Sequence, residues 1–247
     1  MNTNFNSKDK IYFTLLKIFD TIKPMEMKDY IEHTVLKPNV TKEELTSFLD
    51  DAKKYSFKGV CINPVHVAFA KKFLNGTSTN IVTVIGFPLG ANATEVKAFE
   101  AAQAVKDGAD EIDMVINVTA LKDQDYDFVL KDIKAVVKAS GEKAVKVILE
   151  TDLITQEEIK KACLICIEAG AKFVKTSTGF VNGGVGAKTE DVKLMHETVK
   201  DFGLKVKASG GIRSYEDAQK MIDAGASRLG TSAGVKIVQG LVSDSQY

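Results

Sequence analysis

The sequence predicts a single α/β domain, a (β/α)₈ TIM barrel in which eight parallel strands, each followed by a helix, close into a ring. Short β-branched runs alternate with longer segments of helical composition along the chain. Strict alternation with short connections implies parallel strands and right-handed crossovers. Eight such units in 247 residues favour a closed barrel over an open sheet, which would more often show an early Gly-x-Gly-x-x-Gly turn.

The predicted strands are short apolar runs bounded by turn residues, as expected of strands buried on both faces. In chain order they are Tyr30–Thr34, Gly59–Ile62, Ile81–Gly86, Glu111–Ile116, Ala144–Glu150, Phe173–Ser177, Lys205–Ser209 and Arg228–Thr231. Before this series, residues 1–27 form an N-terminal extension with a helical apolar pattern, and residues 28–247 form the barrel domain. The extension is expected to cap the bottom of the barrel or to sit against a partner subunit.

Helix start and stop signals lie between the strands. Thr41-Lys-Glu-Glu44 and Thr155-Gln-Glu-Glu158 are capping boxes, and Thr189 is the capping hydroxyl before a third acidic first turn. Several helices are expected to end on a glycine in the left-handed conformation, followed by alanine and the next strand. This Gly-Ala element recurs at Gly108, Gly170 and Gly225. The recurrence fits one βα unit copied around a closed sheet.

Charge and hydropathy limit the classes of partner. Lys+Arg and Asp+Glu number 33 each, so no net field favours nucleic acid, a membrane surface or a polyanion. No apolar run approaches the roughly 18–20 residues of a membrane span. The polar first residues lack the apolar region of a signal peptide, so a cytoplasmic location is expected. Homo-oligomerisation stays open, because barrels associate through helical faces that carry no motif.

The cysteines have the spacing of a redox or metal site at one point, Cys163-Leu-Ile-Cys166. This pair lies within a helical stretch and continues its apolar stripe. Neither a second cysteine pair nor a histidine pair completes a zinc site. The pair is therefore expected to pack in the core, and no metal site is expected.

Two lysines are expected to point into the barrel near the catalytic ends of their strands. Side chains of a barrel strand alternate between interior and helix layer. Val174 and Val206 suit the helix layer, which turns Lys175 and Lys207 inward. Two neighbouring ammonium groups repel, which lowers the pKa of at least one and leaves an amine free to attack a carbonyl. The alternative is a lysine that extends from a strand end toward solvent.

A carboxylate is expected beside these lysines. In Glu111-Ile-Asp-Met-Val-Ile-Asn117 the bulky residues Ile112, Met114 and Ile116 belong under the helices, so Asp113 faces the interior. There it can pair with one of the lysines and move protons through a hydroxyl or water. A purely structural ion pair is the alternative. Lys146 is inward by the same parity and is a weaker candidate for the charge network.

The ends of the last two strands are rich in glycine and hydroxyl groups. Ser209-Gly-Gly-Ile-Arg213 and Gly230-Thr-Ser-Ala-Gly234 each precede a helical segment. Glycines let backbone N–H groups approach an anion, and a following helix N-terminus favours negative charge. The loops after strands seven and eight are the usual phosphate site of barrels. Together the two motifs predict a phosphate-binding site, although each by itself could be an ordinary tight turn.

The residues resemble the deoxyribose-phosphate aldolase family, in order, from about Tyr30 to Ile237. The segments that carry the resemblance are Glu32-His-Thr-Val-Leu-Lys-Pro38, Gly59-Val-Cys-Ile-Asn63, Val82-Thr-Val-Ile-Gly-Phe-Pro88, Glu111-Ile-Asp-Met-Val-Ile-Asn117, Val145-Lys-Val-Ile-Leu-Glu-Thr151, Val174-Lys-Thr-Ser-Thr-Gly179 and Lys207-Ala-Ser-Gly-Gly211. The resemblance implies a metal-independent class I aldolase without a cofactor. Such an enzyme cleaves the phosphorylated sugar 2-deoxy-D-ribose 5-phosphate reversibly to D-glyceraldehyde 3-phosphate and acetaldehyde, a step of deoxyribose phosphate and nucleoside catabolism.

The resemblance also implies roles for individual residues. Lys175 would form the Schiff base, Lys207 would keep that amine uncharged, and Asp113 would relay protons with bound water. The implied phosphate-binding residues are Gly179, Gly210, Gly211, Gly230 and Ser232. In some members a lysine follows the Thr-Ser-Thr-Gly segment, where this sequence has Phe180. Lys37 occupies a position that is asparagine in other members.

Three other functions fit parts of the same pattern. Another Schiff-base aldolase, acting on a sugar phosphate or a keto acid, would share the lysine but use a different donor. A sugar-phosphate isomerase would share the phosphate site without a covalent lysine. An inactive barrel kept as a binding protein would be expected to have lost at least one of Asp113, Lys175 and Lys207, and all three are present.

Overall fold

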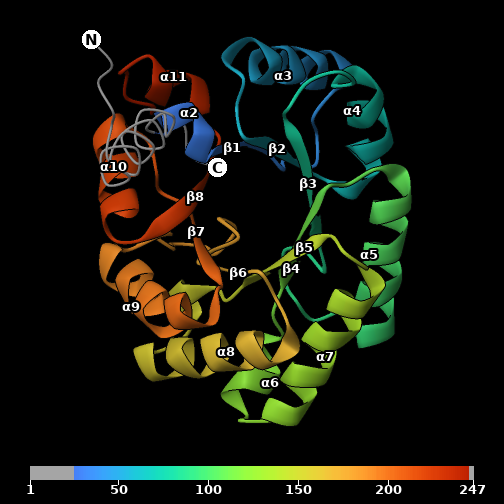
Figure 1. The fold of residues 1–247 in the computed structure, drawn as a ribbon, viewed down its shortest axis with the longest axis vertical. Coiled ribbons are helices and arrows are strands. Elements are labelled where there is room, and N and C mark those ends of the chain that lie inside the picture. The colour runs from blue at the N-terminus through green and yellow to red at the C-terminus, as the bar shows by residue number, and fades with distance from the viewer. Residues whose placement is uncertain (1–24, 245–247) are drawn as a thin grey trace, which may run out of the picture.

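The fold is a closed barrel of parallel strands surrounded by helices, seen in a computed structural model that describes residues 25–244. Within these residues eight strands follow one another around the ring, and β8 pairs with β1. Figure 1 looks into this ring, with the helices on its outside. The strands are β1 Ile31–Val35, β2 Gly59–Ile62, β3 Asn80–Ile85, β4 Glu111–Val115, β5 Ala144–Ile148, β6 Phe173–Lys175, β7 Lys205–Ser209 and β8 Ala226–Thr231. The barrel and all eight predicted strands are confirmed, with small shifts at their ends.

Helices connect each strand to the next and cover the outside of the barrel (Figure 1). The α-helices are α2 Met27–Tyr30, α3 Lys42–Tyr55, α4 Val67–Phe73, α5 Thr94–Asp107, α6 Val118–Lys122, α7 Tyr126–Ala139, α8 Gln156–Ala169, α9 Thr189–Val199, α10 Tyr215–Asp223 and α11 Gly234–Val238. Short 3₁₀ turns are η1 Pro64–His66, η2 Thr151–Leu153 and η3 Lys200–Phe202. Of the predicted extension over residues 1–27, residues 1–24 lie outside the described residues. The helix α2 begins at Met27 and leads directly into β1.

The predicted helix starts are confirmed at two of three positions. Thr41 and Thr155 each accept a hydrogen bond from the backbone N–H three residues on, and the glutamate there bonds back to the capping N–H. The prediction that the Thr189 hydroxyl caps α9 is wrong. Lys188 occupies the capping position in an extended conformation, so Thr189 is already the first helical residue. Its hydroxyl instead contacts the Glu190 carboxylate at 3.4 Å.

The predicted glycine turns after the helices are confirmed. Gly108 and Gly170 cap α5 and α8 with φ of 109° and 80°. Gly225, with φ of 107°, follows the cap of α10 by one residue. At Gly225 a side chain would also collide with the ring of His196. Each of these turns lets the chain reverse from a helix into the next strand within a few residues.

Strand side chains alternate between two environments, as predicted. The apolar residues Ile112, Met114, Val174 and Val206 are buried in the main core between strands and helices. Inside the barrel, a small separate apolar cluster is formed by Leu36, Cys61, Val82 and Val84, with Phe87 packed against it. The interior also holds buried charged side chains, with apolar residues such as Phe173 packed against them, and these charged groups set the position of the site described below.

Cys163 and Cys166 lie fully buried in the apolar core on α8, so the core interpretation is confirmed. Burial raises the pKa of the Cys163 thiol to about 12. The pKa of Cys166 is raised further for the same reason. Among residues 25–244, helices long and apolar enough to cross a bilayer are absent.

One buried ion pair fastens the helix layer away from the barrel interior. Lys97 on α5 donates to Asp132 on α7 at 2.6 Å and to the backbone oxygen of Val115 at 3.1 Å, and both side chains are almost fully buried. The hydroxyl of Thr94 donates to the second Asp132 oxygen at 2.9 Å. This contact ties two helices to the carboxyl end of β4, the strand that carries Asp113.

Replacing Asp132 with alanine is expected to reduce the free energy of unfolding by about 3–5 kcal/mol, because the Lys97 ammonium would remain buried without its carboxylate. Urea unfolding followed by circular dichroism measures the loss. Glu168→Ala is the matched control, because Glu168 pairs with Lys134 in solvent. Its expected change is within about 0.5 kcal/mol. Equal losses in the two variants would contradict the role given to the buried pair.

Candidate active site

The interior of the barrel holds a dense group of charged side chains, hereafter the charge cluster. Strand register places Lys175 directly beside Lys207 on neighbouring strands and Asp113 beside Lys146. Among the described residues, the charge cluster consists of Glu32, Glu111, Asp113, Lys146, Lys175, Lys207 and Arg228. The predicted trio of Asp113, Lys175 and Lys207 is therefore brought together, in the interior as expected.

Asp113 is the centre of the charge cluster. Its Oδ2 accepts from the Nζ atoms of Lys175 at 2.9 Å and Lys207 at 2.6 Å, and its Oδ1 accepts from Lys146 at 2.9 Å. Burial by itself would raise the pKa of Asp113, but the three lysines outweigh it and hold this pKa well below its ordinary range. Asp113 is therefore a persistent carboxylate at neutral pH.

Lys207 has a second carboxylate partner, Glu32 on β1, which also accepts from Arg228 at 3.0 Å. Burial would lower the pKa of Lys207, but Asp113 and Glu32 outweigh it and raise this pKa well above the ordinary value. Lys207 is thus a fixed cation. Lys175 differs from it, because the ion pair found for Lys175 among the described residues is the one with Asp113.

The charges of the cluster do not balance when every group is ionised. Among the described residues joined by its ion pairs, the cluster contains one more cationic side chain than carboxylates, counting Arg228 and three lysines against Glu32, Glu111 and Asp113. Glu150, which is buried after β5 and acts electrostatically on Lys175 without an ion pair to it, lies outside this count. An uncompensated charge is costly in a buried site. The cluster becomes neutral if one amine gives up its proton. Lys146 contacts all three carboxylates, Lys207 contacts two and Lys175 contacts one, so Lys175 is the least extensively paired of the three amines.

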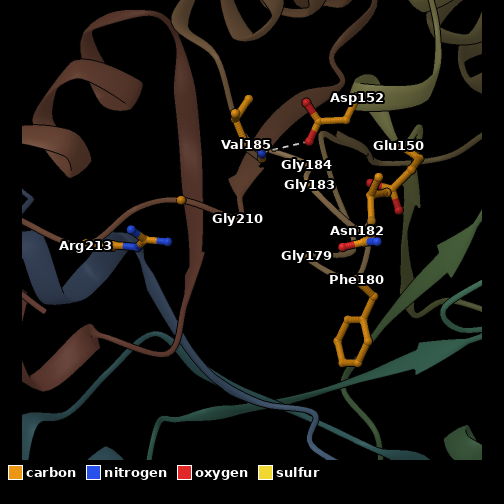
Figure 2. A pocket seen from close by; sticks show the side chains of 13 residues that line it. Glu150, Asp152, Gly179, Phe180, Asn182, Gly183, Gly184, Val185, Gly210 and Arg213 are labelled. Atoms are coloured by element: carbon orange, nitrogen blue, oxygen red, sulfur yellow. Dashed lines mark hydrogen bonds between the residues drawn. The ribbon is translucent and has the colours of Figure 1, made fainter. Parts of the chain in front are cut away.

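A cleft of about 700 Å³ opens at the carboxyl ends of β5, β6 and β7. Figure 2 shows Glu150 and Arg213 on opposite sides of it, with Phe180 on the wall. Glu150 lies within electrostatic reach of Lys175, so the cleft adjoins the charge cluster. The residues that line the cleft are Glu150, Asp152, residues 179–186, Gly210, Gly211 and Arg213.

The predicted phosphate residues meet at this end of the barrel. Gly179, Gly210 and Gly211 line the cleft. A small adjoining cavity shares Gly211 with it and is lined also by Gly230 and Ser232. Gly210 and Gly211 have φ of 84° and 74°, a left-handed backbone that glycine adopts readily. A run of backbone groups in such a conformation can cradle an anion.

Glu32 and Arg228 were not predicted from the sequence pattern, and Lys146 was predicted only as a weaker member of the site. All three belong to the ion-pair network: Lys146 binds Asp113, Glu32 binds Lys207, and Arg228 binds Glu32 and Glu111. Alternation along β1 could have found Glu32, since its neighbour Ile31 packs in the outer core. Arg228 shares the parity of Gly230 on β8, which pairs with Glu32 across the strands.

The two departures from the family pattern lie in different places. Phe180 lines the cleft and packs edge to face against Phe87, with ring centroids 5.1 Å apart. Lys37 is exposed and acts electrostatically on Glu44 at the start of α3. Among residues 25–244, the lining of the cleft and of the adjoining cavity does not include Lys37. The added lysine therefore does not stand in for a cation at the position of Phe180.

Fold and site together define a barrel enzyme with interior lysines next to a glycine-lined cleft, the class that includes the Schiff-base aldolases. The chain belongs to the DeoC/LacD family of aldolases, whose family model matches residues 27–243. It is a lyase of the aldolase type.

Individual relatives support the same family. A protein of Staphylococcus carnosus named deoxyribose-phosphate aldolase is 59% identical over 90% of this chain and all of its own length. One of Mesoplasma florum, named deoxyribose-phosphate aldolase 1, is 54% identical with the same coverage. A tetrameric deoxyribose phosphate aldolase structure from Aeropyrum pernix is 31% identical, with a TM-score of 0.81 over 95% of this chain and 97% of its own.

The charge cluster predicts how stability depends on pH. The pKa values of Asp113 and Glu111 are lowered in the folded protein, in both cases because neighbouring cations outweigh burial. The two carboxylates therefore contribute fully to the free energy of unfolding above their unfolded-state pKa of about 4. This contribution is lost as the pH falls through their pKa values in the folded protein.

Urea unfolding between pH 3 and pH 7 should show stability that is level near neutrality and falls steeply in acid. In Asp113→Asn the fall should be shallower, since this side chain no longer takes up a proton on unfolding. Parallel acid limbs for the wild type and the variant would contradict this assignment.

Proposed function

We propose that the protein catalyses the reversible cleavage of 2-deoxy-D-ribose 5-phosphate to D-glyceraldehyde 3-phosphate and acetaldehyde through a Schiff base on Lys175. Membership of the aldolase family and the names of the relatives support this reaction. The observation that carries the proposal is the buried Lys175 amine, 2.9 Å from the Asp113 carboxylate and beside a glycine-lined cleft. An amine in this environment can bond covalently to an aldehyde.

The reaction requires an uncharged amine, and the charge cluster supplies the reason for one. With Lys207 fixed as a cation by Glu32 and Asp113, loss of the Lys175 proton brings the buried charges into balance. Lys207 thus acts on Lys175 in two ways, through repulsion and by occupying the Asp113 oxygen that Lys175 would otherwise have to itself.

The chemistry then runs through the iminium. The Lys175 nitrogen adds to the C1 carbonyl of the open-chain sugar, and loss of water from the carbinolamine leaves the iminium. When a base takes the proton of the C3 hydroxyl, the C2–C3 bond breaks and its electron pair moves into the iminium, which releases D-glyceraldehyde 3-phosphate and leaves an enamine. Protonation at C2 and hydrolysis then release acetaldehyde and regenerate the amine.

Asp113 serves these steps as a carboxylate. It is a weak base in the resting cluster because its pKa is held low. It orients Lys175 and stabilises the iminium charge, and it passes protons between Lys175 and the departing or attacking water along its 2.9 Å contact. The C3 hydroxyl proton leaves through water held at the same carboxylate.

The phosphate is bound at the opposite end of the cleft. Gly179, Gly210, Gly211, Gly230 and Ser232 supply backbone N–H groups and a hydroxyl to its oxygens, which places the reacting carbons toward the charge cluster. Binding energy from the phosphate thereby orients a part of the substrate that does not itself react.

The proposal includes a cytoplasmic location and assembly into a homo-oligomer, with no nucleic-acid or membrane partner. A central metabolic substrate and the lack of a spanning helix among the described residues support the location. The tetrameric relative from Aeropyrum pernix supports the assembly.

Replacing Lys175 with alanine is expected to lower cleavage by about a thousandfold or more, because the covalent intermediate cannot form. Borohydride reduction in the presence of acetaldehyde should add mass to the peptide that carries Lys175 in the wild type and leave the variant unlabelled. Lys172→Ala is the control, because it removes an exposed lysine directly before β6. This variant should keep both the cleavage rate and the label. Labelling of a different lysine, or turnover of pyruvate or dihydroxyacetone as donor in place of acetaldehyde, would contradict the proposal.

Lys207→Met is expected to reduce activity by about a hundredfold, because the cluster then balances with Lys175 charged. Adding Glu32→Gln removes one carboxylate and makes the uncharged amine favourable again, so the double variant should recover part of the rate. Steady-state kinetics of both variants measure the effect, with urea unfolding as the check on folding. If the double variant is as slow as Lys207→Met or slower, charge balance does not control the amine.

A further inference from the structure

The turn after β5 contacts the loop between β6 and α9, hereafter the cleft loop (residues 178–188), at both of its ends. This turn has the sequence Glu150-Thr-Asp152 and places two carboxylates on one wall of the cleft (Figure 2). Neither carboxylate belongs to the charge cluster, and the reaction described above does not use them. Two acidic groups near an anion-binding end require a structural reason, because they would otherwise oppose the phosphate.

Glu150 holds the beginning of the cleft loop. Its side chain is buried, and its carboxylate accepts hydrogen bonds from the Thr178 backbone N–H at 3.1 Å and from the Thr178 hydroxyl. Its backbone has φ of 59° and ψ of 62°, the left-handed region that residues with a side chain seldom adopt. Such a conformation persists where surrounding contacts fix it, and it turns the chain so that Asp152 also faces the cleft loop.

Asp152 holds the far end of the cleft loop. Its Oδ2 accepts from the Gly186 N–H at 2.8 Å, the dashed line in Figure 2, and its Oδ1 pairs with Lys188 at 3.4 Å. The carboxylate is 9% exposed, whereas Lys188 is 39% exposed. A side chain at Gly184 would come within 2.8 Å of the same Oδ2. The cleft loop is therefore shaped around this one carboxylate.

The held end of the cleft loop rests directly on the predicted phosphate-binding glycines. The Ala187 N–H donates to the Gly210 oxygen at 3.1 Å. A Cβ at Gly186 would lie 2.4 Å from the Gly210 carbonyl carbon, and one at Gly211 would lie 2.5 Å from the Val185 oxygen. Two backbone segments this close leave no room for independent movement. The position of Gly186 therefore sets the positions of Gly210 and Gly211.

We propose that Asp152 is a positioning residue for phosphate recognition, acting through Gly186 on the peptide groups of Gly210 and Gly211. The inference rests on the proposed function, because it assumes that these glycines bind the substrate phosphate. Asp152 offsets the cost of an acidic side chain near an anion by directing its charge into the cleft loop, onto Gly186 and Lys188. It touches neither the reacting carbons nor the charge cluster.

The test compares two substrates, 2-deoxy-D-ribose 5-phosphate and 2-deoxy-D-ribose, which differ only at the phosphate. Asp152→Ala is expected to raise KM for the phosphorylated substrate about tenfold, with kcat changed by less than about threefold. Its kinetics with the unphosphorylated sugar should match the wild type. Inorganic phosphate, used as a competitive inhibitor, should lose affinity by the same factor as the phosphorylated substrate.

Two further variants separate the contacts of Asp152. Asp152→Asn keeps an oxygen that can accept from the Gly186 N–H, and it should restore KM to within about threefold of the wild type. Lys188→Met removes the half-exposed ion pair and should change KM by less than Asp152→Ala does, since exposed pairs contribute little.

A similar loss with both substrates in Asp152→Ala, or an unchanged phosphate inhibition constant, would overturn the inference. If Asp152→Ala does not fold, the comparison of Asp152→Asn with Lys188→Met decides it, since a larger KM effect in Lys188→Met would also overturn it. Failure of the proposed function gives a different result, because the wild type would then cleave neither substrate and form no borohydride adduct with acetaldehyde.

Discussion

The rest of the site depends on the ion pairs made by the carboxylate of Asp113. It binds three lysines from three neighbouring strands, β5, β6 and β7, and β4 supplies the carboxylate itself. None of these ammonium groups could remain in the interior without a carboxylate, because burying an unpaired charge costs several kcal/mol. Glu32 closes the arrangement from β1, on the other side of the ring. The geometry of the site therefore depends on closure of the barrel, because these charged groups meet only when the sheet is closed.

A closed parallel barrel suits this arrangement because it separates two environments within each strand. The outer face packs against helices and holds nearly all of the apolar core. The inner face is released from that task, and a few apolar residues beside Cys61 fill one side of it. Charged groups that satisfy one another electrostatically occupy much of the remaining space, together with apolar side chains such as Phe173. The apolar core between strands and helices thus supplies most of the stability, and the interior can hold charged groups whose arrangement serves the reaction.

Local pattern was sufficient for much of the fold and for the centre of the site. Strand alternation placed Asp113, Lys175 and Lys207 on the interior, because a period of two is a property of each strand by itself. It could not show that Arg228 shares the Glu32 carboxylate with Lys207, since these contacts join β1 to the last two strands of the barrel. The contact of Asp152 with Gly186 depends on the folded path of a glycine-rich loop, which has no periodic signal. The prediction that Thr189 caps its helix was wrong because the helix begins one residue earlier than expected. Capping preference by itself does not fix a helix boundary to within one residue.

The charge balance of the cluster also bears on how the bond between C2 and C3 is broken. In the proposed reaction, an uncharged Lys175 leaves the ion-paired groups of the cluster neutral in sum, so formation of the iminium returns one excess positive charge to a largely buried site. An enamine removes that charge again. The low-dielectric interior therefore favours the flow of electrons from the breaking bond into the iminium, more than an exposed lysine could. In the proposed complex the phosphate is held at the far end by backbone groups and fixes the sugar without neutralising the cluster, so the excess charge remains available to drive the step.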